Sequence, residues 1–208
     1  MTSELSLFEA IYTTRAIRKF KTDPIPDSVL RKVLEAAGQA PSGGNRQPWR
    51  FVVIRDQQVK SKVSDLVLRT QQPPEGSNVD RQDSSSVSPG VAFAKSLAEV
   101  PVIIIVCAQK PATVGPWSVG PFGQTYPAVE NLLLAARAFG LGGTITTGYR
   151  SLEPEIKDLL GLPESVDSTC LIPLGFPLDS EGERHGKKSR KPIEDWTHED
   201  YWGGKISF

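Results

Sequence analysis

The feature that most constrains the fold is an unbroken apolar run after Pro101, Val-Ile-Ile-Ile-Val-Cys-Ala at residues 102–108. β-branched side chains favour extended backbone, and a run without polar alternation suits a strand that is covered on both faces. We therefore predict a central strand here, inside a sheet with helices packed on both of its sides. No apolar run approaches the roughly 20 residues that a helix needs to cross a bilayer, so we expect no membrane association.

The rest of the chain predicts a mixture of helices and a few strands. Shorter apolar, β-prone runs occur at 51–54, 144–147 and 169–174. Helical patterns cover 5–12, a segment ending near Gly38, 57–70, 124–139 and 152–160. Because strands and helices do not alternate regularly, we predict the α+β class. At 208 residues the chain is long enough for one complete core, so we treat 1–208 as a single domain.

The helical segment 124–139 carries an unusually wide apolar band. A surface helix shows one apolar stripe, whereas this band, which includes Val129, Leu132, Leu133, Leu134 and Phe139, covers more than one face. We expect the helix to be buried almost all round.

Composition excludes several partners and compartments. Twenty-four Lys and Arg balance 24 Asp and Glu, so no global field attracts nucleic acid or an anionic membrane. The N-terminus lacks a cationic segment followed by an apolar one, which favours a cytoplasmic protein. Cys107 and Cys170 each lie in an apolar run, where a buried thiol is favoured over a disulfide or redox pair.

Several familiar chemistries lack the residues that they need. His185 and His198 are the only histidines and both lie in a polar C-terminal stretch, which argues against a Ser-His-Asp triad and a His-rich metal site. Gly-x-Gly-x-x-Gly after a strand and Gly-x-x-x-x-Gly-Lys-Ser/Thr are both absent. Neither a dinucleotide-binding Rossmann fold nor a P-loop fold is therefore expected, and we predict no metal.

Two basic clusters are candidates for an anion site. Arg15 and Arg18 lie three residues apart, so in a helix both guanidinium groups would leave from one face and could grip the same phosphate. Lys187, Lys188, Arg190 and Lys191 form the second cluster. Each cluster alone could equally be a solvated charged surface.

The loop at residues 40–49, Ala-Pro-Ser-Gly-Gly-Asn-Arg-Gln-Pro-Trp, suits a flat polar ligand. Gly43 permits close backbone approach, and Ser42, Asn45 and Gln47 offer hydroxyl and amide groups. The pyrimidine edge of a flavin needs such partners. A plain connecting turn is the alternative, because Pro41 and Pro48 also suit a turn.

Two further segments can be interpreted in more than one way. Residues 71–90 are rich in Gln, Ser, Pro and Asp, as expected either of a solvated surface loop or of a lid over a substrate. The C-terminal extension, 178–208, is charged but holds half of the four tryptophans, Trp196 and Trp202. We expect this aromatic tail to pack on a partner subunit, with packing on its own domain as the alternative.

Taken in order along the chain, these motifs resemble the nitroreductase family. The resemblance rests on Thr-Arg-Ala-Ile-Arg-Lys-Phe at 14–20 and on the 40–49 loop. It continues in Glu-Asn-Leu-Leu-Leu-Ala-Ala at 130–136, Ile-Pro-Leu-Gly-Phe-Pro at 172–177 and Lys-Ser-Arg at 188–190. The family implies a central, mostly antiparallel sheet flanked by helices and a homodimer with FMN at its interface. A C-terminal extension would wrap the partner subunit.

The resemblance also implies site residues, position by position. Arg15, Ala16 and Arg18 would lie along the FMN, with Lys188 and Arg190 on its phosphate. Pro41, Ser42, Gly43, Asn45 and Gln47 would approach the ring from the other subunit, and the backbone of Thr147 and Gly148 would meet the flavin. Thr14, Ala16 and Thr147 depart from the Arg, Ser and Glu that the family often has there.

The implied activity is a ping-pong oxidoreductase. NADH or NADPH would reduce the flavin, and a nitroaromatic, a quinone or a similar small acceptor would then take the electrons; the protein supplies position rather than a catalytic side chain. Trp117, Phe122 and Tyr126 could stack on an aromatic acceptor, although a core or interface role is as plausible for each. The alternatives are a reductive dehalogenase, a flavin-destroying enzyme or a flavin-binding module without turnover.

Overall fold

A computed structural model describes residues 5–71, 88–110 and 120–206 of the chain. Its centre is one four-stranded antiparallel sheet in the order β1-β2-β4-β3. The strands are β1 (Trp49–Ile54), β2 (Val102–Gln109), β4 (Val166–Gly175) and the very short β3 (Gly142–Gly143). The apolar run of residues 102–108 is thus a central strand, paired on both sides, as its sequence predicts.

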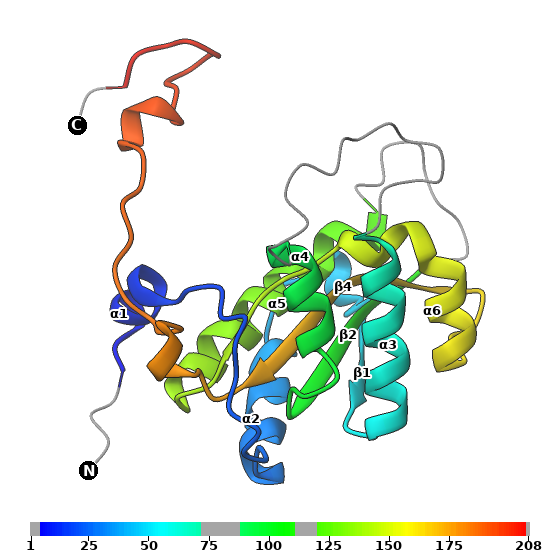
Figure 1. The fold of residues 1–208 in the computed structure, drawn as a ribbon. Coiled ribbons are helices and arrows are strands. Elements are labelled where there is room, and N and C mark those ends of the chain that lie inside the picture. Colours follow the sequence, from blue (N-terminus) through cyan, green and yellow to red (C-terminus); the bar gives the residue numbers. More distant parts are fainter. Residues whose placement is uncertain (1–4, 72–87, 111–119, 207–208) are drawn as a thin grey trace, which may run out of the picture.

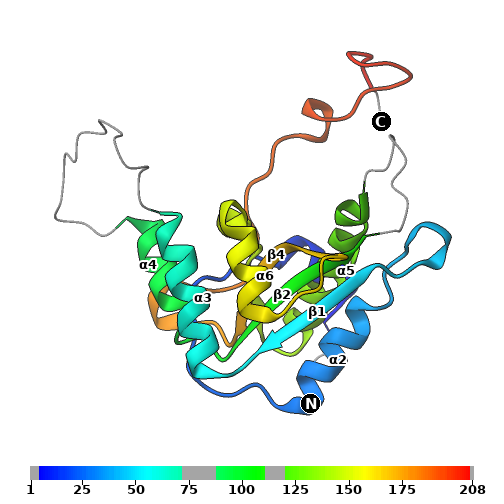
Figure 2. The same ribbon diagram turned by 90° about the vertical axis from the view of Figure 1, so that its right-hand side faces the viewer.

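Helices cover both faces of this sheet (Figures 1 and 2). On one face lie α2 (Asp27–Ala37) and α5 (Gly120–Ala138), and on the other lie α3 (Gln57–Arg69), α4 (Pro89–Ser96) and α6 (Glu153–Leu160). Successive β2 side chains enter opposite layers: Ile104 packs with α2 and α5, whereas Ile105 packs with α3 and α6. The predicted class, α+β with helices flanking a mostly antiparallel sheet, is confirmed.

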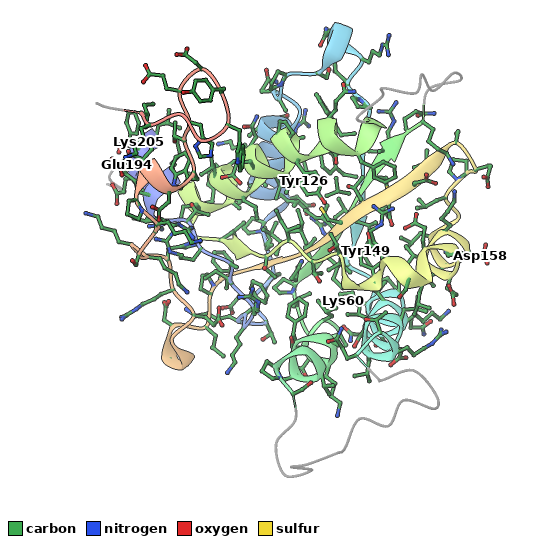
Figure 3. The ribbon with its side chains drawn as sticks, turned by 90° about the horizontal axis from the view of Figure 1, so that it is seen from above. Lys60, Tyr126, Tyr149, Asp158, Glu194 and Lys205 are labelled. Atoms are coloured by element: carbon green, nitrogen blue, oxygen red, sulfur yellow. The ribbon has the colours of Figure 1, made fainter. Side chains whose placement is uncertain are left out.

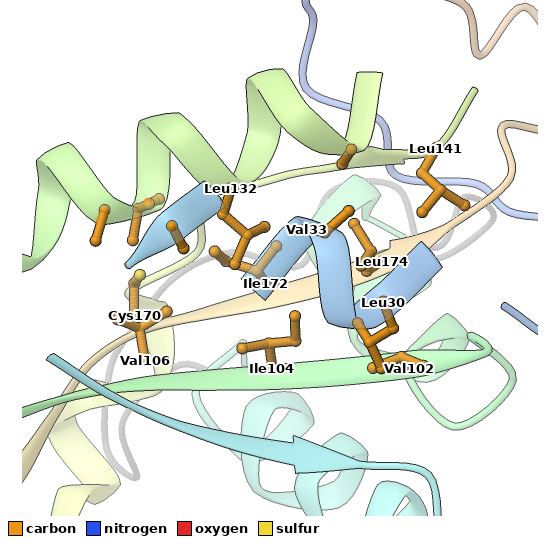
Figure 4. Close-up of a cluster of buried hydrophobic side chains, with 14 of the residues drawn as sticks. Leu30, Val33, Val102, Ile104, Val106, Leu132, Leu141, Cys170, Ile172 and Leu174 are labelled. Atoms are coloured by element: carbon orange, nitrogen blue, oxygen red, sulfur yellow. The ribbon is translucent and has the colours of Figure 1, made fainter. Parts of the chain in front are cut away.

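The layer between α2, α5 and the sheet is an apolar cluster (Figure 4). Leu30 and Val33 of α2 and Leu132 of α5 interlock with Ile104 and Ile172 of the two central strands, and all five are almost completely buried. At roughly 1.5–3 kcal/mol for each large aliphatic side chain removed from water, such a layer is a main source of stability. The cluster also includes Leu141, which precedes β3, and Leu174 near the end of β4, and the N-terminal segment pairs with β3 beside them.

Most predicted elements are confirmed, but two predictions are wrong in informative ways. Residues 144–147 do not form a strand; the pairing lies two residues earlier, in β3, and Thr146 makes only an isolated bridge to Leu171. Strand β3 consists of glycines, not of the β-branched residues that follow it, because the N-terminal segment passes very close to it. A Cβ on Gly142 would lie 2.4 Å from Cγ1 of Ile17. Close approach, which propensity does not encode, decides the pairing.

The second wrong prediction concerns α5. The helix begins at Gly120 rather than 124, and it includes Pro127. In this single chain it is not buried almost all round: Tyr126 is 39% exposed, and Phe139, just beyond its end, is 38% exposed. An uncovered apolar side therefore remains on α5.

The N-terminal helix α1 (Leu7–Thr13) and the C-terminal tail lie together at one side of the molecule (Figure 1). After Leu178 the chain passes α1 and then extends away from the body, with only short 3-10 turns at Asp179–Glu181, η3, and Ile193–Asp195, η4. Trp196 and Trp202 are 63% and 89% exposed. The two tryptophans of the tail therefore do not pack on their own domain. Residues 72–87, most of the predicted surface loop or lid, lie outside the described residues.

Cys107 and Cys170 are both free and fully buried in the sheet. Burial raises the pKa of Cys107 to about 12 and that of Cys170 to about 11, because the thiolate loses its hydration there. The interpretation of both as small buried hydrophobes is confirmed. No helix in the described part of the chain is long and apolar enough to cross a membrane.

Candidate functional site

The two basic clusters of the sequence meet in one cleft, which we call the basic cleft. It measures about 550 Å³ and is lined by two stretches of chain: Thr14, Arg15, Ala16 and Arg18 from the N-terminal segment, and Gly182, Glu183, Arg184, His185, Gly186, Lys187, Lys188 and Arg190 from the tail. Six Arg and Lys side chains therefore face one carboxylate, that of Glu183. Such a concentration of guanidinium and ammonium groups suits a phosphate.

The N-terminal wall of the basic cleft is extended, not helical. Residues 15–20 form isolated bridges, Ala16 with Gly143 and Phe20 with Pro177, and the Ile17 N–H donates to the Gly143 carbonyl at 3.0 Å. The premise that Arg15 and Arg18 share a helix face is therefore wrong. Helix α1 ends at Thr13 because the segment behaves as an additional edge strand beside β3, and this pairing brings both arginines to the cleft.

The Arg15 side chain is partly committed to structure. Its Nη1 and Nη2 donate to the carbonyls of Thr14 and Tyr12, at 2.6 and 2.9 Å, so the guanidinium lies at the C-terminal end of α1. A cation is favoured there by the helix dipole. Thr14 turns its hydroxyl inward to the Ala10 carbonyl at 2.7 Å. Of Thr14 and Arg15, which open the 14–20 motif, only Arg15 therefore presents positive charge to the cleft.

Arg18 connects the basic cleft to a second, smaller cleft. This cleft measures about 220 Å³ and is lined by Arg18, by Thr144, Ile145 and Thr146 after β3, and by Pro89, Gly90 and Phe93 of α4. Thr147 and Gly148 follow immediately, at the start of the 3-10 helix η2 (Gly148–Leu152). Arg18 thus lines both the basic cleft, which holds Lys188 and Arg190, and the smaller cleft, whose lining ends at Thr146, one residue before the candidate backbone at 147–148.

A buried hydrogen-bond chain fixes η2 against the sheet. The Glu153 carboxylate accepts from the Ser168 N–H at 2.7 Å and from the Ser168 hydroxyl, and the Tyr149 hydroxyl donates to Ser168 Oγ at 2.9 Å. Tyr149 is completely buried in the middle of the body (Figure 3), and this burial raises the pKa of its hydroxyl. The position of Thr147 and Gly148 is therefore set by residues up to 21 positions downstream.

The 40–49 loop is tightly constrained. Gly44, Asn45 and Gln47 all adopt positive φ, +57°, +53° and +47°. Gly and Asn adopt this conformation readily, but for Gln47 it costs roughly 1–2 kcal/mol, and such strain is concentrated at functional sites. The Ser42 hydroxyl accepts from the Gln47 N–H at 3.0 Å, and the Gly43 N–H donates to Gln124 Oε1 at 2.9 Å.

The loop and the basic cleft are separate within one chain. No loop residue lines the cleft, and viewed from above the sky-blue loop and the orange-red tail lie apart from each other (Figure 3). Pro41, Ser42, Gly43, Asn45 and Gln47 are therefore not brought together with Arg15, Arg18, Lys188 and Arg190 by the fold of a single chain.

The three candidate substrate-binding residues, Trp117, Phe122 and Tyr126, differ in their structural surroundings. Trp117 lies outside the described residues. Phe122 is half-buried in the first turn of α5, with the Arg150 guanidinium 4.8 Å from its ring centroid, which is a cation–π contact. Tyr126 lies on the exposed side of α5 (Figure 3).

Sequence reasoning missed two residues that shape the site. Gln124 holds the loop from 81 residues away, and nothing in the sequence distinguishes it from any other polar helix residue. His185 lies in the wall of the basic cleft and is hydrogen-bonded on both of its ring nitrogens. Its position between Glu183 and Lys187 suggested only a polar tail.

Known proteins share both this sequence and this fold. The model of the Nitroreductase family matches residues 11–176. The chain belongs to this family. A curated relative, the NADH dehydrogenase of Thermus thermophilus, is 32% identical over 192 residues, covering 86% of this chain and 89% of that protein. The predicted family and the predicted oxidoreductase class are thereby confirmed.

Two solved structures in the same fold show what such proteins can hold. The NADPH:FMN oxidoreductase from Vibrio harveyi, complexed with NAD+, has a TM-score of 0.72 at 22% identity, covering 93% of this chain and 76% of that one. An iodotyrosine deiodinase bound to FMN and 3-iodo-L-tyrosine has a TM-score of 0.70 at 24% identity, covering 90% and 96%. At these identities the likeness establishes the fold.

Proposed function

We propose that this member of the nitroreductase family is an FMN-dependent oxidoreductase that uses NADH or NADPH to reduce small acceptors such as nitroaromatics and quinones. The observation that carries the proposal is the basic cleft, in which six cationic side chains from two distant segments converge. A phosphate with up to two negative charges and several acceptor oxygens fits this donor set. The FMN-bound and NAD+-bound structures of the same fold support the choice of cofactor and reductant.

The lining of the two clefts suggests how FMN is held. Lys188 and Arg190, with Arg15, would bind the phosphate, and Ala16 would lie beside the sugar chain. Arg18, which lines both clefts, would reach the pyrimidine edge, and the Thr147 and Gly148 backbone would lie along the ring. Positive charge from Arg18 near that edge favours an electron-rich flavin.

The separation of the loop from the cleft supports a homodimer. Pro41, Ser42, Gly43, Asn45 and Gln47 would complete the site of a second copy, which a rigid, preformed loop can do without further ordering cost. Large apolar side chains are also left exposed: Leu7, Phe8, Ile11 and Tyr12 on α1, and Trp196, Tyr201 and Trp202 in the tail. A partner that covers them would remove a large apolar area from water, as an obligate dimer does.

In this proposal the protein positions and the cofactor reacts. FMN, when bound, supplies hydride transfer from the nicotinamide and onward to the acceptor. The arginines and lysines of the basic cleft fix the phosphate end, and the backbone at 147–148 fixes the ring. The Phe122 and Arg150 pair offers an aromatic surface beside a positive charge, which would favour flat acceptors that carry partly negative nitro or carbonyl oxygens.

The test is spectroscopic. The purified protein, or the apoprotein reconstituted with FMN, should show a flavin spectrum that bleaches when NADH or NADPH is added without oxygen. Adding a nitroaromatic or a quinone should restore the colour. A preparation that binds no FMN would contradict the proposal, and a bound flavin that no nicotinamide bleaches would favour a binding module without turnover.

Charge removal in the cleft provides a matched test. The double substitution Lys188→Ala and Arg190→Ala should weaken FMN binding roughly 30- to 900-fold, since each charge-assisted contact contributes on the order of 1–2 kcal/mol. Lys62→Ala removes an exposed lysine of α3, which does not line the cleft, and should leave the affinity unchanged.

Reductive dehalogenation is a second candidate activity. It is favoured by the deiodinase fold match, which covers 96% of that chain. We expect a dehalogenase to release iodide from 3-iodo-L-tyrosine under reducing conditions, whereas the quinone and nitroaromatic reductase should release none. Measuring iodide beside nicotinamide oxidation separates the two, and loss of the flavin itself would instead indicate a flavin-destroying member.

A further inference from the structure

His185 joins three segments that are far apart in the sequence. Its Nδ1 accepts the backbone N–H of Arg15 at 3.2 Å, and its Nε2 lies 3.0 Å from the Leu141 carbonyl, one residue before β3. The neighbouring Gly186 N–H donates to the Thr13 carbonyl at 2.8 Å. The imidazole thus fastens the tail to the N-terminal segment and to the edge of the sheet at one point.

These two contacts determine the protonation state of the ring. A carbonyl oxygen can only accept, so Nε2 must carry the hydrogen, and the Arg15 N–H can only donate, so Nδ1 must be bare. The neutral Nε2–H tautomer satisfies both partners. A proton on Nδ1 would place N–H against N–H and would break the contact with Arg15.

The charges around the ring oppose its protonation. Burial, which is the largest cause, lowers the pKa of His185 from its ordinary value of 6.5, and Arg137 of α5 and Arg15 add positive charge nearby. The Leu141 carbonyl and the Asp179 carboxylate raise the pKa and only partly compensate. The remaining ionisable groups of the same cleft are Glu183, Arg184, Arg18, Lys187, Lys188 and Arg190, and all but Glu183 are cations.

The place of His185 in the tail gives these contacts a consequence for the cleft. Lys188 and Arg190 follow three and five residues later and have no helix or strand of their own to hold them. The Glu183 carboxylate accepts from the Arg18 N–H at 2.9 Å, so the tail has a second attachment two residues before the histidine. Downstream of these residues, the described tail leaves the body.

We propose that neutral His185 is a positioning residue that holds the basic tail segment 186–190 opposite Arg15 and Arg18, and that protonation of its ring releases this segment and weakens FMN binding. The inference rests on the proposed function and extends it to regulation by acidity. His185 itself need not touch the phosphate.

The sign of the pH dependence follows from the lowered pKa. Well above pH 6.5 the ring is neutral whether the tail is attached or released, so the attachment of the tail through His185 has its full stability. As the pH falls below 6.5 the released tail binds a proton that the attached tail excludes, so the attachment weakens until the pH passes the folded pKa. FMN affinity, which needs the attached tail, falls over the same interval.

The experiment measures the dissociation constant of FMN by flavin fluorescence between about pH 8 and pH 5, across the range in which histidine titrates. The wild type is compared with His185→Asn and with His198→Gln. Asn places an amide oxygen near the position of Nδ1, where it can accept the Arg15 N–H but cannot titrate. His198, the other histidine, stacks on Trp202 in the distal tail, with ring centroids 4.5 Å apart.

We expect the wild type and His198→Gln to lose affinity below pH 6.5 by up to about tenfold per pH unit relative to His185→Asn. Titration of the FMN phosphate near pH 6 affects all three proteins equally and cancels in this comparison. Parallel profiles for wild type and His185→Asn would overturn the inference while leaving the proposed cofactor site intact. Failure of all three to bind FMN at any pH would contradict both.

A second measurement does not depend on whether His185→Asn folds. In the wild-type apoprotein, amide hydrogen exchange over residues 183–190, corrected for its intrinsic pH dependence, should lose protection between about pH 7.5 and pH 5.5. Amides of β2 should not change over that range. Equal protection of the tail at both pH values would refute the role of His185 without reference to FMN.

Discussion

Substituting Gly142 by alanine tests whether close approach of the N-terminal segment organises the site. An added Cβ would lie 2.4 Å from Cγ1 and 2.9 Å from Cβ of Ile17, closer than non-bonded carbons come. Ile17 is 1% exposed and has no space into which to retreat. The N-terminal segment must therefore move away from β3.

The magnitude follows from two losses. Overpacking in a filled core costs about 1–3 kcal/mol. Displacement of the segment also weakens the 3.0 Å bond from the Ile17 N–H to the Gly143 carbonyl, which contributes about 1 kcal/mol. Together we expect Gly142→Ala to lower the free energy of unfolding by about 2–4 kcal/mol, or the Tm by roughly 4–16 °C for a chain of this size.

The assay is thermal unfolding of the FMN-free protein at one fixed concentration, followed by circular dichroism. Gly38→Ala is the matched control, because Gly38 lies at a helix end with ordinary negative φ and its added Cβ would come no closer than 3.3 Å to any atom outside its neighbours. In a double-mutant cycle, Ile17→Ala should absorb much of the Gly142→Ala penalty, since it removes the nearest clashing atom. A Gly142→Ala protein within about 0.5 kcal/mol of wild type would refute the reasoning.

Three further outcomes are expected. Glu153→Gln should lower the free energy of unfolding by about 1.5–3 kcal/mol, seen in urea denaturation, because the carboxylate accepts both the N–H and the hydroxyl of Ser168; an unchanged midpoint would contradict it. Cys107 and Cys170, whose pKa values burial raises to about 12 and about 11, should stay unmodified by a thiol reagent at about pH 8 until denaturant is added. Fast labelling of the native protein would show that the strands open readily. Truncation after Lys191 should shift the protein toward monomer in light scattering, because it removes Trp196 and the rest of the exposed aromatic tail; a dimer of unchanged affinity would place the interface elsewhere.

The basic cleft shows how far the sequence could lead. Both of its walls can be recognised in the sequence as clusters of positive charge. Arg15 and Arg18 lie in the first family motif of the chain, and Lys188 and Arg190 lie in the last. Arg15 and Arg18 do not share a helix face, because their segment is not helical. Pairing with β3 makes the segment extended, and that pairing depends on glycines about 125 residues further along.

The sequence by itself determined those features that depend on the conformational preferences and the hydrophobic pattern of neighbouring residues. The β-branched run of residues 102–108 specifies a strand covered on both faces, and helical periodicity specifies α3, α6 and the end of α2 to within two residues. The order of short motifs is enough to indicate the family. These are properties of neighbouring residues, so they can be read along one chain.

Only the tertiary structure decided how distant groups meet. The hydrogen bond from the Arg15 N–H to His185 joins residues 170 positions apart, and the one from the Gly43 N–H to Gln124 joins residues 81 positions apart. The separation of the loop from the basic cleft is likewise a property of the folded chain. Hydrogen bonds at such separations depend on the packing of the whole sheet and its helices, and no local preference encodes them. For the same reason the exposed side of α5 and the exposed aromatic tail became visible only once the single chain was folded.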